Sequence, residues 1–167
     1  YSNTTASSNV ANGFESLYSN TTGTGNTADG FQSLLSNTTG NYNSAHGTSA
    51  LNSNTIGTYN TAVGNGSLYA NTNGNSNTAN GFQSLFLNTT GYQNTVSGQG
   101  ALYNNTGGFA NTAVGYGADV ASGNLTKAMA LGAFTMVTAS NKVLRGNASV
   151  NVIDGQWVWS NFIDGTF

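Results

Sequence analysis

The chain has 167 residues, the length of one ordinary domain. Only 5% of its residues are charged, whereas a typical globular domain has about 25%. The net charge of -2 gives no basic field for nucleic acid or anionic lipid. Cysteine is absent, which excludes disulfides and thiolate metal sites. The hydrophobic runs are also too short to span a membrane, so we expect neither a nucleic-acid partner nor membrane insertion.

A glycine repeats along the chain at a fixed interval. The chain opens in mid-unit, with residues 1–8 as the second half of a truncated repeat. Steps of 17 residues then separate Gly13, Gly30, Gly47, Gly64, Gly81, Gly98, Gly115 and Gly132, and Gly146 follows after a step of 14. We number the repeat so that Asn9 is position 1 and Gly13 is position 5. Such strict internal periodicity indicates a stacked repeat architecture.

Each repeat predicts two short strands joined by turns. A period of 17 is too short for helical repeats, which need about 33 residues or more. The segment "NTAxG" at positions 1–5 is typical of one strand, and a second is expected around the leucine at position 9. The segment "NTTG" at positions 12–15 predicts a turn, since Asn and Thr bond nearby backbone and Gly takes positive φ easily. Stacked coils of this kind form an all-β parallel β-solenoid, with a rise of about 4.8 Å per coil.

Identical residues should form ladders along such a stack. We expect the thin core to contain the leucines at position 9: Leu17, Leu34, Leu51, Leu68, Leu85 and Leu102. A ladder of amides is expected at position 1: Asn9, Asn26, Asn43, Asn60, Asn77, Asn94 and Asn111. These amides could form a ligand-binding array, but stacked Asn side chains also hydrogen-bond along an axis. We therefore favour a structural role for this ladder.

Two further rows of large hydrophobic residues do not fit inside one coil. They lie at position 6 (Phe14, Phe31, Phe82) and position 10 (Tyr18, Tyr69, Phe86, Tyr103). Exposed hydrophobic rows usually indicate an interface. We expect several chains to pack along them, most simply as a symmetric trimer. The alternative is a wider core within a single chain.

The composition changes near the C-terminus. We divide the chain into a solenoid region, 1–140, and a segment of one shorter coil and a hairpin-like cap, 141–167. Asp154-Gly155 is a strong hairpin signal, and Trp157 and Trp159 share a face of the following stretch. An open solenoid end needs a cap or a partner. The two tryptophans could provide that cap, join the inter-chain interface or form a ligand platform, and we favour the cap.

The unit "NTAVGNGSL…NTNG" at 60–74, followed by the shorter coil "KVLRGNASV", resembles the head repeats of trimeric autotransporter adhesins. That resemblance implies a left-handed β-roll in an intertwined homotrimer. The tail "NKVLRGNASVNVIDGQWVWSNFIDGTF" is similar to the segment before the intramolecular-chaperone domain of phage tail fibres. Ile163-Asp164 stands where that family has the Ser-Asp pair that marks self-cleavage, so the nucleophile is missing at that place.

We find no constellation of catalytic residues in the sequence. The single histidine, His46, lies at a variable position, and the few acids are spread over different coils. We therefore expect no enzyme, no metal and no cofactor. The main hypothesis is a structural and adhesive segment of an extracellular fibre, on a bacterial or virion surface, which binds itself and a host-surface glycan or protein receptor. The alternative is a solenoid whose Thr and Asn rows bind ice or a glycan surface.

Overall fold

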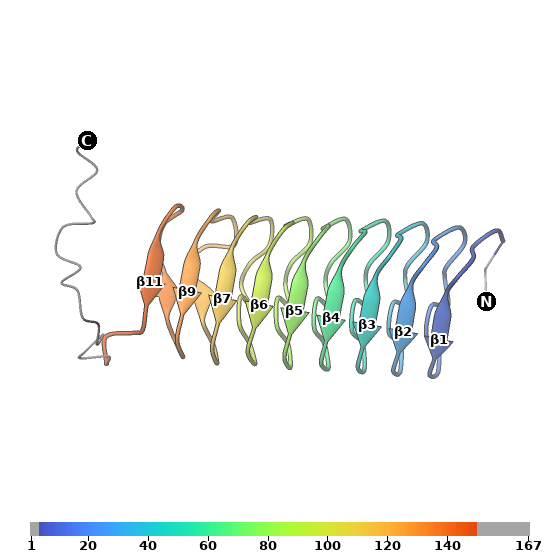
Figure 1. The fold of residues 1–167 in the computed structure, drawn as a ribbon, viewed down its shortest axis with the longest axis horizontal. Coiled ribbons are helices and arrows are strands. Elements are labelled where there is room, and N and C mark those ends of the chain that lie inside the picture. Colours follow the sequence, from blue (N-terminus) through green and yellow to red (C-terminus); the bar gives the residue numbers. More distant parts are fainter. Residues whose placement is uncertain (1–3, 150–167) are drawn as a thin grey trace.

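The computed structural model describes residues 4–149, which form a straight rod of stacked coils without any helix (Figure 1). The repeat strands are β1 (Val10–Asn12), β2 (Thr27–Asp29), β3 (Ser44–His46), β4 (Thr61–Val63), β5 (Thr78–Asn80), β6 (Thr95–Ser97), β7 (Thr112–Val114), β9 (Met129–Leu131) and β11 (Val143–Arg145). They form one 9-stranded sheet in chain order. The short strands β8 (Asp119–Val120) and β10 (Met136–Val137) form a second, 2-stranded sheet.

All strand pairs are parallel, and each residue pairs with its equivalent in the next coil. Ala28 lies opposite Ala45 and Ala62 opposite Ala79, which is the register that a 17-residue repeat demands. The chain is therefore an all-β parallel β-solenoid, as the sequence predicts. The left hand of the coil stays a prediction from the resemblance, and the trimer stays a prediction from the exposed hydrophobic rows and the resemblance.

The strand begins after position 1 and ends at position 4, directly before the glycine of position 5. Position 3 points inward and is fully buried, as at Ala62 and Ala79. Glycine is required next because the backbone there has φ near +137° at Gly81, a conformation that other residues rarely adopt. A Cβ on Gly81 would also lie 2.5 Å from the carbonyl oxygen of Gly98 in the next coil. The repeated glycine thus allows the coils to stack closely.

The second strand that we expect around position 9 does not form in the regular coils. Leu85, for example, has φ of +51° and lies in a turn. Its side chain is nonetheless fully buried, and so are those of its equivalents Leu34, Leu51, Leu68 and Leu102. The turn conformation lets the leucine point inward while its N–H donates to the next coil, as Leu85 N does to Ala101 O at 2.9 Å.

The last coils depart from this pattern. In β8 and β10 the chain is extended, and the buried hydrophobic residues move to position 10, at Val120 and Val137. Met136, at the leucine position, is 43% exposed, whereas Asp119 is buried. The second strand therefore exists only where the sequence lacks the leucine. β11 continues the sheet beyond residue 140 as the shorter last coil.

Two ladders of buried asparagines hold the coils together. At position 1, Asn43 donates from Nδ2 to Gly57 O (2.8 Å) and to Asn26 Oδ1 (3.1 Å), which also accepts the Asn43 backbone N–H (2.9 Å). At position 12, Asn54 donates to the same Gly57 carbonyl (3.0 Å) and to Asn37 Oδ1 of the preceding coil (2.7 Å). Within residues 4–149, no buried side-chain nitrogen or oxygen lacks a partner.

Candidate functional site

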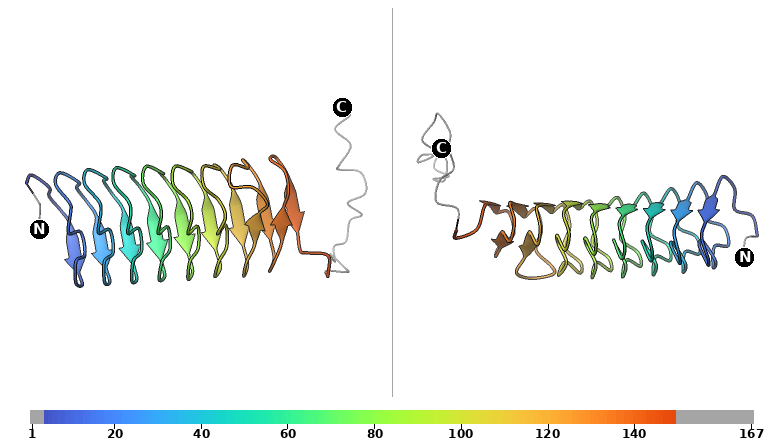
Figure 2. Two further views of the ribbon diagram at one scale, coloured as in Figure 1. Left: turned by 180° about the vertical axis from the view of Figure 1, so that it is seen from behind. Right: turned by 90° about the horizontal axis from the view of Figure 1, so that it is seen from below.

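The strand face is the flat side of the rod formed by the outward side chains at positions 2 and 4 (Figure 2). Thr61, Thr78 and Thr95 are consecutive and exposed on it. Their hydroxyls form no hydrogen bond within the described chain, and neighbouring strands lie about 4.8 Å apart. The face therefore offers a regular row of unused hydroxyls, which Val10 and Ser44 interrupt toward the N-terminal end.

The threonines of position 13 are different. Each hydroxyl donates to a carbonyl of the next coil, as Thr38 does to Thr55 O at 3.0 Å and Thr72 to Thr89 O at 3.1 Å. The two asparagine ladders are likewise buried and fully bonded. These rows use their donors to join coils, whereas the position 2 hydroxyls stay open to a ligand.

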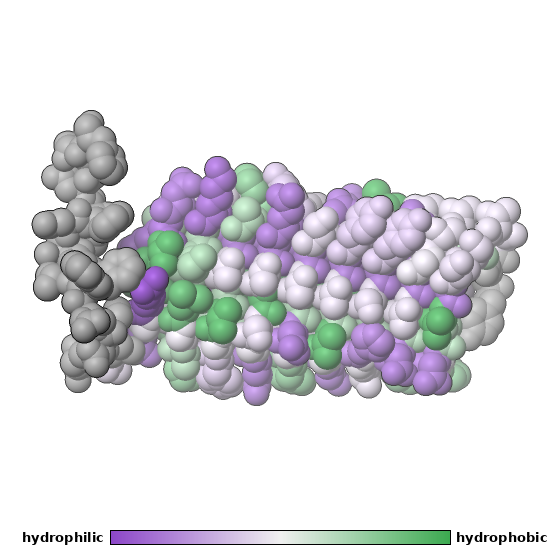
Figure 3. Space-filling view, viewed as in Figure 1, coloured by the Kyte–Doolittle hydropathy of each residue, from purple (hydrophilic) through white to green (hydrophobic). Residues whose placement is uncertain are grey.

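Hydrophobic side chains gather at the C-terminal end of the strand face, over β7, β9 and β11 (Figure 3). Val114 is 45% exposed and Val143 is 56% exposed, and between them Met129 and Leu131 are half-buried. The neighbouring middle of the face is weakly polar. A hydrophobic end on an otherwise hydroxyl-rich flat surface is suited to contact with another molecule.

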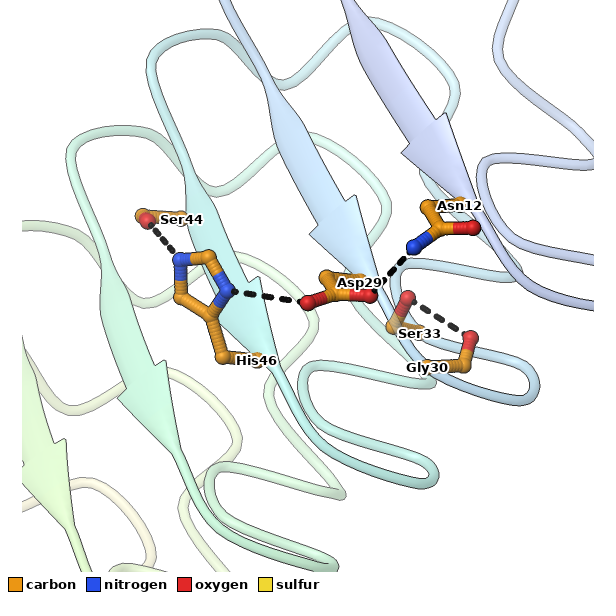
Figure 4. A network of polar contacts seen from close by, with 6 residues as sticks. All are labelled: Asn12, Asp29, Gly30, Ser33, Ser44 and His46. Atoms are coloured by element: carbon orange, nitrogen blue, oxygen red, sulfur yellow. Dashed lines mark hydrogen bonds and ion pairs between the residues drawn. The ribbon is translucent and has the colours of Figure 1, made fainter.

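A Ser–His–Asp chain crosses the strand face between β2 and β3 (Figure 4). His46 Nε2 lies 3.1 Å from Ser44 Oγ, and His46 Nδ1 lies 3.8 Å from Asp29 Oδ2. Asp29 also accepts a hydrogen bond from Asn12 Nδ2 at 3.0 Å. Sequence analysis interprets His46 as a residue at a variable position, although the 17-residue register already places Asp29 beside it in the preceding coil.

This cluster has the residue order of a nucleophilic triad but lacks other parts of one. The His46–Asp29 separation is that of a loose ion pair, and both side chains are largely exposed. Acyl transfer also needs backbone N–H groups aimed at the developing oxyanion. The nearest amides are already engaged, with Ser44 N donating to Asn60 O and Gly47 N to Asp29 O. The geometry supports a surface polar network.

Asp119 is a buried carboxyl with a perturbed pKa. Burial raises its pKa above the ordinary value, and hydrogen bonds from Val120 N, Asn104 N and Asn104 Nδ2 oppose that shift. It lies inside the coil stack. Within residues 4–149, no three His, Asp or Glu side chains come together as a metal set would. No helix there is long and hydrophobic enough to cross a bilayer.

The aromatic rows do not form a wider core. At position 6, Phe14, Phe31 and Phe82 are 67%, 47% and 46% exposed. At position 10, Tyr18 and Tyr69 are exposed, and Phe86 and Tyr103 are half-buried. Several rings stack along the axis, with 5.1 Å between the centroids of Tyr69 and Phe86 and 5.2 Å between those of Phe86 and Tyr103. Trp157 and Trp159, expected as part of the interface or cap, lie outside the described residues.

Sequence analysis misses a further set of aromatics on the opposite edge. Tyr42 stacks on Tyr59 with centroids 5.2 Å apart, and Tyr92 stacks on Phe109 at 4.7 Å. They lie at positions 17 and 16, where the residue type varies between coils. The signal for them is an aromatic recurring at the same position in adjacent coils, as the register shows for Tyr42 and Tyr59.

The edge groove is a hollow of about 230 Å³ where the chain turns after strands β5, β6, β7 and β9. Its walls are the rings of Phe82, Tyr116 and Phe134 and the carboxamide side chains of Gln83 and Gln99. Its floor includes Gly100 and Gly117. Tyr116 and Phe134 pack edge to face, with centroids 4.9 Å apart.

Comparison with known proteins adds no relative to this picture. No family model, no curated protein and no solved structure matches the chain.

Proposed function

We propose that this chain is a structural and adhesive segment of an extracellular fibre made of three parallel copies. The observation that supports this most is the path of the chain. The described chain enters the rod at β1 and leaves it at β11, at the opposite end of the long axis (Figure 1). Units built this way can be joined end to end to lengthen a fibre. The weakly charged, hydroxyl-rich composition also suits a surface-exposed fibre.

The hydrogen bonds between coils give such a segment its stiffness. Every regular coil is joined to the next by strand pairing, by backbone bonds in the turns and by two asparagine ladders. Bending the rod would stretch all of these bonds on one side. A stiff rod that repeats the same surfaces suits attachment through many weak contacts, because linked sites bind a host glycan or protein with avidity.

The strand face is the surface that we propose for contact between copies. It is flat, runs the length of the sheet and ends in the hydrophobic side chains of Val114, Met129, Leu131 and Val143 (Figure 3). The position 6 row is less continuous, since Thr48, Asn65 and Gln99 interrupt it. Many of the edge rings also cover one another by stacking along the rod. This choice differs from the aromatic rows expected from the sequence, and the two surfaces can be separated by mutation.

Size-exclusion chromatography with light scattering tests this arrangement. The purified chain should elute at three times its mass of 17.1 kDa. Val114→Lys combined with Val143→Lys should give the single-chain mass, because both side chains are exposed in one chain and only association buries them. Phe14→Ser with Phe31→Ser, on the edge, should leave the trimer intact. Dissociation by the edge pair alone would place the contact on the aromatic rows, and a stable monomeric wild type at micromolar concentration would overturn the trimer.

A second function is favoured by one observation, the free hydroxyls of Thr61, Thr78 and Thr95. A flat, rigid row of hydroxyls with regular spacing is what binding to an ice lattice or an ordered glycan surface requires. This function needs the strand face uncovered, so it predicts a monomer. Thr78→Tyr should then abolish thermal hysteresis, and Thr90→Tyr, at an exposed site outside the strand face, should not. Absence of hysteresis in the wild type would reject the ice-binding form of this function.

A further inference from the structure

We propose that the edge groove binds a neutral saccharide ring. The inference deepens the adhesive role proposed above, because it names a ligand class and a location for it. The groove lies on the turns after the strands, so an assembly through the strand face leaves it accessible.

The aromatic walls provide stacking surfaces for a sugar. Phe82 is 46% exposed, Tyr116 50% and Phe134 60%, so their rings remain largely uncovered after folding. The C–H groups on one face of a pyranose carry partial positive charge, and the face of an aromatic ring carries partial negative charge. Two rings set edge to face, as Tyr116 and Phe134 are, present two stacking directions around one hollow.

The polar wall matches hydroxyl groups. Gln83 and Gln99 form no hydrogen bond through their side chains within the described chain, although each carboxamide offers two donor hydrogens and an acceptor oxygen. Vicinal hydroxyls of a sugar both donate and accept, so they can use both sides of such an amide. No charged residue lines the groove. The recognition chemistry therefore favours an uncharged saccharide over a sialylated, sulfated or phosphorylated one.

The hollow exists because glycine replaces a larger residue. Position 7 carries Glu15 and Gln32 in the first coils, where Gln32 Nε2 donates to Glu15 Oε2 at 2.7 Å and the side chains fill the edge. At Gly100 the same position is empty, and a Cβ built there meets nothing within 4 Å. The first coils thus have stacked aromatics, Phe14 on Phe31, beside long side chains at position 7 where the groove has glycine, and they serve as an internal control.

The size of the hollow limits the ligand to one ring-sized unit. Pockets for drug-sized ligands measure roughly 300–1,000 Å³, and this groove is smaller, at about 230 Å³. It is also open along the edge of the rod. A single sugar residue within a longer neutral chain fits both features.

Saturation-transfer NMR with the full chain tests the proposal. The probes are the methyl glycosides of glucose, galactose and N-acetylglucosamine and, for comparison, a proline-rich peptide. At least one glycoside should receive saturation on its ring protons. Tyr116→Ala should weaken its binding roughly tenfold by removing a stacking partner. Gly100→Gln should abolish binding by filling the hollow.

Gly100→Gln should fold normally, because Gln32 and Gln83 occupy the same position with φ of +54° and +51°, close to +61° at Gly100. Its far-UV circular dichroism should match that of the wild type. Phe31→Ala is the matched control, since it removes an equivalent ring that does not line the edge groove, and it should bind as the wild type does. No transfer to any glycoside, equal transfer in the Gly100→Gln variant, or transfer to the peptide instead would overturn the proposal. A trimer that binds no glycoside would reject this inference while leaving the fibre role intact.

Discussion

Asn60 lies at the centre of the position 1 ladder, and replacing it by alanine tests what holds the coils together. Its Oδ1 accepts the backbone N–H of Asn77 at 3.0 Å and Asn77 Nδ2 at 3.1 Å. Its Nδ2 donates to Gly74 O at 2.8 Å and to Asn43 Oδ1 at 3.1 Å. All of these contacts lie in the buried interior of the rod.

The hydrogen bonds lost in Asn60→Ala affect these partners unequally. Gly74 O keeps its bond from Asn71 Nδ2 (3.1 Å), and Asn43 Oδ1 keeps its bond from the Asn60 backbone (3.0 Å). The Asn77 backbone N–H, however, is left buried without an acceptor. One unsatisfied buried donor costs about 1–3 kcal/mol, and each further lost bond costs about 0.5–1.5 kcal/mol. With one orphaned donor and three further lost bonds, we therefore expect Asn60→Ala to lower the free energy of unfolding by about 2.5–7.5 kcal/mol, a large part of the 5–15 kcal/mol typical of a domain.

Denaturant unfolding followed by far-UV circular dichroism measures this change, with all proteins at one concentration because association shifts apparent stability. Asn80→Ala is the matched control. Asn80 is exposed on the same stack of strands and forms no side-chain hydrogen bond within the described chain, so its loss should change stability by less than about 0.5 kcal/mol. If Asn60→Ala unfolds within that margin of Asn80→Ala, the ladder does not stabilise the rod.

Three further changes should follow from the same structure. Gly81→Ala should destabilise the chain more than a typical exposed substitution and lower its melting temperature. The reason is that the new Cβ would lie 2.5 Å from Gly98 O and that the backbone has φ of +137°. An unchanged melting temperature would contradict the close stacking of coils. Leu85→Ala should cost about 2–5 kcal/mol in denaturant unfolding, as for other fully buried leucines; a cost under about 1 kcal/mol would show that the core adds little. Burial raises the pKa of Asp119 above 3.8, so the folded chain holds more protons than the unfolded chain between the two values. The contribution of Asp119 to the free energy of unfolding is therefore fully present below pH 3.8 and is lost as the pH rises through the raised pKa. Asp119→Asn should remove that part of the pH dependence, and identical pH profiles for wild type and variant would refute the assignment.

The fold could be predicted because every regular coil repeats the same sequence pattern. A constant step of 17 residues fixes the register, and the inward alanine, leucine and asparagine positions follow from it. The turn around Leu85 could not be predicted from alternation. Placing a non-glycine residue at φ near +50° is rare, and only the bonds to neighbouring coils make it regular here.

The candidate sites were harder to predict than the fold. In the Ser44–His46–Asp29 network, Asp29 lies 17 positions before His46 in sequence. The members therefore look unrelated until equivalent positions of neighbouring coils are compared. The edge groove depends on what is missing at Gly100, and a glycine in a chain with 23 of them carries little information by itself. The burial of Val120 beside the buried Asp119 also required knowledge of the backbone, because β8 is extended where the regular coils form a turn.

Sedimentation velocity of the 167-residue chain tests the central claim most directly, since one run reports both mass and shape. A trimeric fibre segment predicts a single species at three times 17.1 kDa, with the frictional ratio of an elongated particle, across the micromolar range. A single species at 17.1 kDa throughout that range would contradict the fibre and leave the strand face as the exposed surface of a monomer.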